Sequence, residues 1–173
     1  VPAVAVVAAG PLLEPARERR TVRSLVRQPL DIHRYPSPLQ AFRRNITDFK
    51  TEVLLTAQGA PVGSRIRLGT MDAYDGFTYN VSNTTAYGPD SGTFGKIGAR
   101  VDDPTPGTEI DVDVRLGRLS GVWLPTVGQT LRVDFTGPRG VGLADAFFYN
   151  QRSGTGLVPV TVREGDQYRL RAV

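Results

Sequence analysis

The stretch EIDVDVRL, residues 109–116, alternates charged and apolar side chains without a break. Successive side chains of a β-strand point to opposite faces of the sheet. One face of this segment is therefore apolar, while the other carries Asp111 and Asp113. A strand with one buried face and one face in water is typical of an antiparallel sheet.

The same period of two continues through the chain from residue 52 onward. Its short runs are separated by clusters of turn residues, in a chain that holds 19 glycines and 13 prolines. Short strands joined by turns, without helical crossovers, favour a β-sandwich or a barrel. We predict a mainly β protein, an antiparallel β-sandwich of about eight strands. The runs are EVLLTA, RIRLGT, GFTYNV, EIDVDVRL, QTLRVDF, AFFYN, LVPVTVR and QYRLRAV.

One short amphipathic helix is predicted before the strands, near residues 38–49. Ser37 can serve as its N-cap, and Pro38 suits the first helical position. Four large apolar residues recur at helical spacing and form one stripe. The sequence predicts that this stripe docks on the sandwich. Its members are Leu39, Phe42, Ile46 and Phe49.

The chain opens with the apolar segment VPAVAVVAAGPLL, residues 1–13, and a basic run follows it. A membrane-spanning helix needs about 20 apolar residues. The opening segment is therefore the cut end of a transmembrane helix in a longer parent, the tail of a signal segment, or a disordered terminus. We predict a membrane-proximal lead over residues 1–21 and a single β-sandwich domain over residues 22–173.

Charge and composition exclude several classes of function. Residues 1–50 hold nine of the 21 Lys and Arg residues but only four of the 17 acidic residues, so the remainder is close to neutral. A nucleic-acid-binding domain more often carries its basic residues on the folded face, so no nucleic-acid partner is expected. The chain has no cysteine and a single histidine, His33. Thiol nucleophiles, thiolate metal sites and multi-histidine sites are thereby excluded.

The segment TMDAYDGFTYNVSN, residues 70–83, holds the most suggestive pair of carboxylates. Asp75 and Gly76 form a dipeptide that favours a tight hairpin turn. A two-residue turn would place Tyr74 opposite Phe77, and Asp72 would then need a hydrogen-bond donor. We interpret Asp72, Asp75 and Gly76 as structural turn residues. The alternatives are a calcium site or a carboxylate pair for catalysis, which would have to line one cleft.

Two further groups of residues are candidates for function. Asp111 and Asp113, with Asp102 and Asp103, could form a surface calcium site. The interpretation that we favour is a strand face in water whose charges serve solubility. Tyr74, Tyr87 and Trp123 are candidates for contact with a glycan or a peptide. For Trp123, a role in the core or in a domain contact is the interpretation we favour, because its neighbours are Val, Leu and Pro. No catalytic residue, metal site or cofactor site is predicted, and a hydrolase that uses Asp72 and His33 is the weakest alternative.

Five stretches occur in an order that resembles a known family. They are DIHRYPSPLQAFRRNITDFK, RIRLGTMDAYDGFTYNVS, GVWLPTVG, ADAFFYNQRSGTGLV and VREGDQYRL. Together they resemble the extracytoplasmic region of actinobacterial transglutaminase-like membrane proteins (the TgpA type), over about residues 22 to 173. In that family, transmembrane helices lead into a β-rich module and then a papain-like core with a Cys-His-Asp triad. Tyr79 departs from the pattern, because the family often has Trp there.

The resemblance implies a role but no chemistry for this chain, which lacks the cysteine of the triad. It implies a non-catalytic module of the cell envelope, outside the membrane and tethered to it. The module would position a Cys-His-Asp core that follows residue 173, and its partners would be that core and the transmembrane region of the same parent. The alternative is a β-sandwich that binds a cell-envelope glycan or peptide.

Overall fold

The computed structural model describes residues 30–82, 92–96, 100–101 and 105–173, and it is mainly β. The predicted lead over residues 1–21 lies outside these ranges, as do Tyr87, Asp102 and Asp103. The helical elements are a 3₁₀ turn, Ile32–Arg34, and the helices α1, Pro38–Thr47, and α2, Gly140–Asp145. The strands are β1 Leu55–Gln58, β2 Ile66–Arg67, β3 Ala73–Tyr74, β4 Tyr79–Asn80, β5 Gly95–Lys96, β6 Ile110–Leu116, β7 Gly121–Leu124, β8 Thr126–Val127, β9 Thr130–Thr136, β10 Phe148–Asn150, β11 Thr155–Val162 and β12 Gln167–Ala172.

Two antiparallel four-stranded sheets form the body of the protein. Their orders are β1-β6-β12-β9 and β5-β10-β11-β7, and β2-β8 and β3-β4 form two small additional pairs. Buried side chains from both large sheets belong to one apolar cluster, which includes Val114, Leu124, Val158 and Leu170. Two sheets that share a core in this way form a sandwich. The predicted mainly β, antiparallel fold is confirmed.

Strand β6 has the alternation that its sequence predicts. Val112, Val114 and Leu116 are buried, and the residues between them are exposed. The strand lies between β1 and β12, where Val112 is opposite Leu170. Its apolar face therefore lines the middle of the core, and its charged face lies on the outside of the sheet.

Helix α1 has the predicted position but not the predicted orientation. The side chain of Ser37 accepts a hydrogen bond from the Leu39 N–H at 3.4 Å, and Pro38 begins the helix. However, Leu39 is 39% exposed, Phe42 is 52% exposed and Ile46 is 53% exposed. The expectation that this stripe docks on the sandwich is therefore wrong for these three residues. The buried residue of the helix is Asn45.

Contacts at both ends of α1 explain its orientation. At the start, the Trp123 Nε1–H donates to the Pro36 carbonyl at 2.7 Å. Pro38 packs so closely on Gly69 that a Cβ there would lie 2.8 Å from the proline ring. At the other end, the Arg118 guanidinium lies 5.3 Å from the centre of the Phe49 ring. These contacts turn the helix face with the buried asparagine toward the sandwich, and they leave the apolar stripe facing outward.

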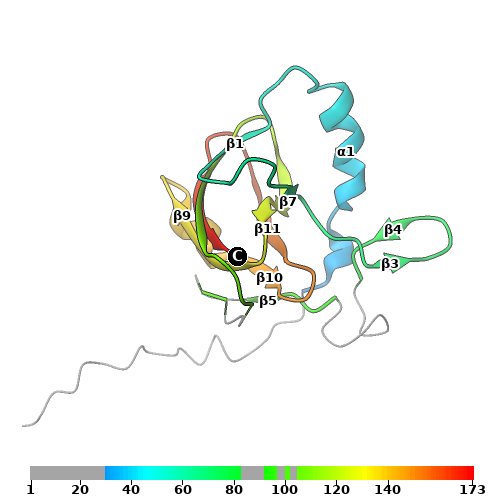
Figure 1. Ribbon diagram of the computed structural model, residues 1–173. Coiled ribbons are helices and arrows are strands. Elements are labelled where there is room, and N and C mark those ends of the chain that lie inside the picture. The colour runs from blue at the N-terminus through cyan, green and yellow to red at the C-terminus, as the bar shows by residue number, and fades with distance from the viewer. Residues whose placement is uncertain (1–29, 83–91, 97–99, 102–104) are drawn as a thin grey trace, which may run out of the picture.

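The sequence did not predict α2 or β7. Helix α2 is six residues long, contains two glycines and has no side-chain cap, yet its Leu143 is fully buried in the core. Strand β7, GVWL, shows no alternation because three of its four residues are buried. In Figure 1, β7 lies between the rest of the sandwich and α1, so this strand is the one that α1 faces.

Candidate functional site

A cavity of about 360 Å³ lies between α1 and β7 and is partly open to solvent. Its size falls in the range of small-molecule and peptide sites, and apolar side chains make most of its walls. Four parts of the chain that are far apart in sequence meet here. They are residues 36–45, Leu68, residues 119–123 and Thr161.

Strand β7 forms one wall. It is the last strand of its sheet, so it pairs with β11 on one side and with no described strand on the other. Trp123 is 9% exposed, packs against Phe94 and Leu157, and also lines the cavity. The tryptophan therefore has the core role that we considered, and it also presents part of its surface to the cavity.

Helix α1 forms the opposite wall and supplies the polar groups. Asn45 is 6% exposed, and its side chain makes no hydrogen bond with any residue in the described ranges. The residue as a whole is buried, but its amide atoms are not fully enclosed, so the polar group keeps access to the cavity that the residue lines. Arg44 lines the cavity as well and donates a long hydrogen bond of 3.5 Å to the Ser120 hydroxyl.

Thr161 completes the lining with a strained backbone. It is the one non-glycine residue of the described ranges with a positive φ, at 55°. A β-branched residue in this conformation is a genuine outlier, and such strain is concentrated at functional sites. Thr161 lies in an irregular part of β11, where the register against β7 shifts between Leu157 and Val162.

Arg139 holds this irregular segment of β11 in place through hydrogen bonds to its backbone. The Arg139 Nη2–H group donates to the carbonyls of Val160 and Thr161 at 3.3 and 3.1 Å. Its Nη1 lies 2.7 Å from Oδ2 of the buried Asp166. The shape of the cavity therefore depends on a charged pair of the sandwich itself.

The hairpin residues have a turn function in the structure. The Asp75 carboxylate accepts hydrogen bonds from the N–H groups of Phe77 and Thr78 at 2.8 and 2.7 Å, which lowers its pKa, with the bond from Thr78 as the larger cause. Gly76 has a φ of +97°, which glycine adopts without strain. Asp72 accepts a hydrogen bond from the Ser82 N–H at 2.7 Å.

The register of this hairpin differs from the expected one. Tyr74 pairs with Tyr79 instead of Phe77, so the loop has four residues instead of two. The Asp75 side chain explains the difference, because it binds two N–H groups inside the loop. The rings of Tyr74 and Tyr79 lie 4.7 Å apart on the surface, and Phe77 at the tip is 94% exposed. In Figure 1 the hairpin projects outward near one end of α1.

His33 and Asp72 form no hydrogen bond with each other. His33 is exposed in the 3₁₀ turn, where its N–H donates to Asp31 Oδ1. A hydrolytic pair of these two residues therefore has no geometric support.

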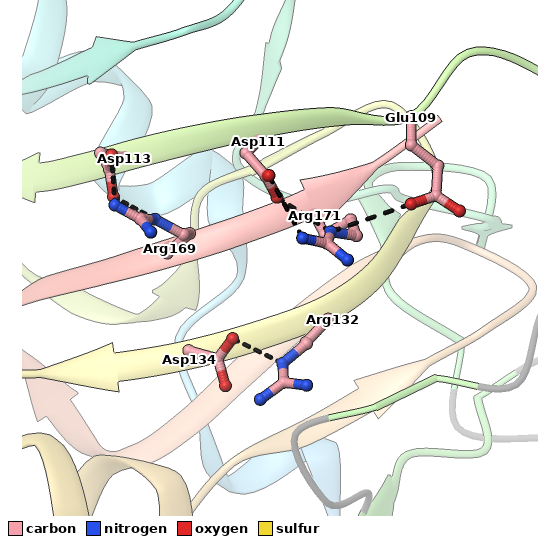
Figure 2. A network of polar contacts seen from close by, with 7 residues as sticks. All are labelled: Glu109, Asp111, Asp113, Arg132, Asp134, Arg169 and Arg171. Carbon is pink, nitrogen blue, oxygen red and sulfur yellow. Dashed lines mark hydrogen bonds and ion pairs between the residues drawn. The ribbon is translucent and has the colours of Figure 1, made fainter.

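The acidic face of β6 is neutralised by arginines of β12, as Figure 2 shows. Arg169 binds Asp113 through two hydrogen bonds of 2.7 and 2.9 Å, and Arg171 binds Asp111 through two of 3.0 and 3.2 Å. These hydrogen bonds lower the pKa of both carboxyls. Within the described ranges, no group of three or more His, Cys, Asp or Glu residues could hold a metal ion. The cross-strand pairs explain these carboxylates without calcium.

Comparisons with protein-family models, with curated proteins and with solved structures find no match for this chain. Among the helices of the described ranges, none combines the length and the apolar character that crossing a bilayer requires.

Sequence reasoning missed Asn45, Arg44 and Thr161. Asparagine has a low helix propensity, because its side chain competes for backbone hydrogen bonds. An asparagine within a short amphipathic helix was therefore a signal, since a local choice that conflicts with the fold often marks a functional position. Nothing in the sequence indicated the positive φ of Thr161.

Proposed function

We propose that the protein is a non-catalytic extracytoplasmic module of a membrane-anchored transglutaminase-like protein, and that it positions a downstream catalytic core. One observation carries the proposal, which is the outward apolar stripe of α1. Leu39, Phe42 and Ile46 are each at least 39% exposed on consecutive turns of one helix. Contiguous exposed apolar surface of this kind is typical of an interface with another protein or domain.

Two sequence features support the same proposal. The chain has no cysteine, so a thiol nucleophile for transamidation would have to come from another part of the parent. The order of the five stretches over residues 22 to 173 resembles that of the extracytoplasmic region of the TgpA type. The downstream catalytic core would then be the partner that covers the apolar stripe of α1.

The coding sequence beyond the codon for Val173 tests the parentage directly. A Cys-His-Asp core is expected there, and a stop codon or an unrelated domain would contradict the proposal. The encoded core is then tested for binding to this module by analytical ultracentrifugation. The triple variant Leu39→Ser/Phe42→Ser/Ile46→Ser should abolish binding. The triple variant Val62→Ser/Val141→Ser/Val160→Ser removes exposed apolar residues elsewhere and should retain it.

A second candidate function is the binding of a cell-envelope glycan or peptide. The specific observation in its favour is the cavity between α1 and β7, with the unpartnered amide of Asn45 in its wall. The two functions use opposite faces of α1, so they are compatible in one molecule. A ligand that shifts the NMR signal of the Trp123 indole N–H would support this function. If none of the tested glycans and peptides shifts this signal, the result would count against this function.

A further inference from the structure

We propose that the cavity between α1 and β7 binds a short extended peptide that carries a free carboxylate. This inference rests on the second candidate function, and it names the class of ligand. Its basis is the combination of a strand edge, the cavity-facing amide of a buried asparagine and an unbalanced positive charge in one cavity. Each of these three features is suited to bind a different part of such a peptide.

The edge of β7 favours an extended main chain. Ser120, Gly121, Val122 and Trp123 are consecutive in sequence and all line the cavity. The outer edge of β7 pairs with no described strand. A peptide that adds to such an edge gains main-chain hydrogen bonds, while neighbouring pockets select its side chains. Three of these, residues 121–123, belong to β7 and span about 10 Å, which corresponds to a peptide of about three residues.

The Asn45 side chain favours an amide as its partner. It is nine-tenths buried, lines the cavity and has both a donor and an acceptor unused by the described residues. One residue of an extended peptide presents its own N–H and C=O on the same side of the chain, so it can satisfy both groups at once. The ring hydroxyls of a sugar can do so as well, but they do not match the strand edge.

The charge of the cavity favours a carboxylate. Arg44 is the only charged residue among the described residues that line it, and no acidic side chain is among them. Arg44 also forms no ion pair with an acidic side chain within the described ranges. A guanidinium can bind a carboxylate through two parallel hydrogen bonds. The strained Thr161 and the anchoring Arg139 keep the third wall fixed, so the site is preorganised.

The test uses the isotope-labelled chain and three sets of probes. These are a library of N-acetyl tripeptides with a free carboxylate, the same library as C-terminal amides, and chitotetraose. The signals to follow are the Trp123 indole N–H and the Asn45 side-chain amide. Tripeptide acids should shift both signals, and they should bind about tenfold or more tightly than the amides, as expected for one charge-assisted hydrogen bond.

Matched variants locate the binding. Asn45→Leu and Arg44→Gln should each weaken binding of the acids about tenfold or more. Arg43→Gln removes a neighbouring exposed charge from outside the cavity and should leave binding unchanged. If Asn45→Leu does not give a dispersed spectrum, Asn45→Ser replaces it. Equal binding of acids and amides, or full binding by the Arg44→Gln variant, would overturn the carboxylate assignment.

The probes also separate this inference from the function on which it rests. If chitotetraose alone shifts the two signals, the peptide is excluded while the protein remains a binding module. If no probe shifts either signal at millimolar concentration, both the peptide and the binding module are overturned. The role as a positioning module would still stand, because it depends on the outward stripe of α1.

Discussion

Trp123 donates its indole N–H to the carbonyl of Pro36 at 2.7 Å, and this bond joins strand β7 to the start of helix α1. The two residues are 87 positions apart in sequence. The bond fixes where α1 begins and helps to set which face it turns toward the sandwich. Both proposals depend on that orientation, because one uses the outward face and the other uses the inward face.

Replacing Trp123 by phenylalanine should loosen α1 more than the rest of the protein. The change removes the hydrogen bond to Pro36 while keeping an aromatic ring beside Phe94. The expected loss of stability is about 1 kcal/mol, the usual net contribution of one hydrogen bond. Hydrogen exchange should show faster exchange in residues 38–47 than in the strands β6 and β12. Equal acceleration in all three elements would contradict the anchoring role of this bond.

The pair Arg139–Asp166 should contribute far more to stability than its surface counterparts. Arg139→Met would leave the buried carboxylate of Asp166 without its guanidinium partner and free the carbonyls of Val160 and Thr161. We expect a loss of about 3 kcal/mol in urea melts, as for other broken buried pairs.

Arg132→Met provides the matched control for that experiment. It breaks an equally short pair with Asp134, but both side chains are more than one third exposed. Its expected cost is much smaller than that of Arg139→Met, because exposed ion pairs contribute little. Similar losses for Arg132→Met and Arg139→Met would show that Arg139 does not hold the wall of the cavity.

The acidic face of β6 should make stability depend on pH in the acid range. The pKa values of Asp111 and Asp113 are lowered in the folded protein by their hydrogen bonds to Arg171 and Arg169. Their stabilising effect is therefore present above the unfolded pKa, near 4, and is lost as the pH falls through the lower folded values. Melting temperatures measured from pH 6 to pH 2 should fall with acid.

The double variant Asp111→Asn/Asp113→Asn should show a shallower fall over the same range. Calcium should leave the melting temperature of the wild-type chain unchanged, because arginines already satisfy these carboxylates. A steep rise with calcium that the double variant lacks would instead restore the calcium interpretation.

The fold could be predicted where apolar and polar residues alternate in the sequence with the same period as buried and exposed side chains do in the structure. Strand β6 alternates in both respects, and α1 begins at the predicted cap, Ser37. Strand β7 could not be predicted, because it is buried on both faces and its sequence does not alternate. Helix α2 lacks a cap and contains glycines, so its own residues have little tendency to form a helix. The burial of Leu143 in the core stabilises it instead.

The candidate site could not be predicted from the hydrophobic pattern of the sequence, for a different reason. An apolar stripe on a helix predicts which face will be covered, but not by what. We expected the sandwich to cover Phe42, whereas contacts of Pro36, Pro38 and Phe49 turn Asn45 inward. Such contacts join distant parts of the chain, and no local window contains them.

An Asn45→Leu variant should be about as stable as the wild type. The change replaces a cavity-facing amide, to which no described residue is hydrogen-bonded, by an apolar side chain of similar volume. No hydrogen bond to a described residue is lost, so a change within about 0.5 kcal/mol is expected in urea melts. A loss of more than about 1 kcal/mol, the usual net contribution of one hydrogen bond, would show that Asn45 has a structural partner, and it would contradict a role in ligand binding.

The central claim is that α1 turns Phe42 outward and Asn45 inward, and the stability of Phe42→Ser in urea tests it most directly. Phe42 is 52% exposed, so the account predicts a change within about 0.5 kcal/mol of the wild type, as for other surface substitutions. A loss of about 3–5 kcal/mol, the usual cost of removing a buried phenylalanine, would contradict it. Phe42 would then be packed on the sandwich, and both the outward stripe and the cavity beneath α1 would be absent.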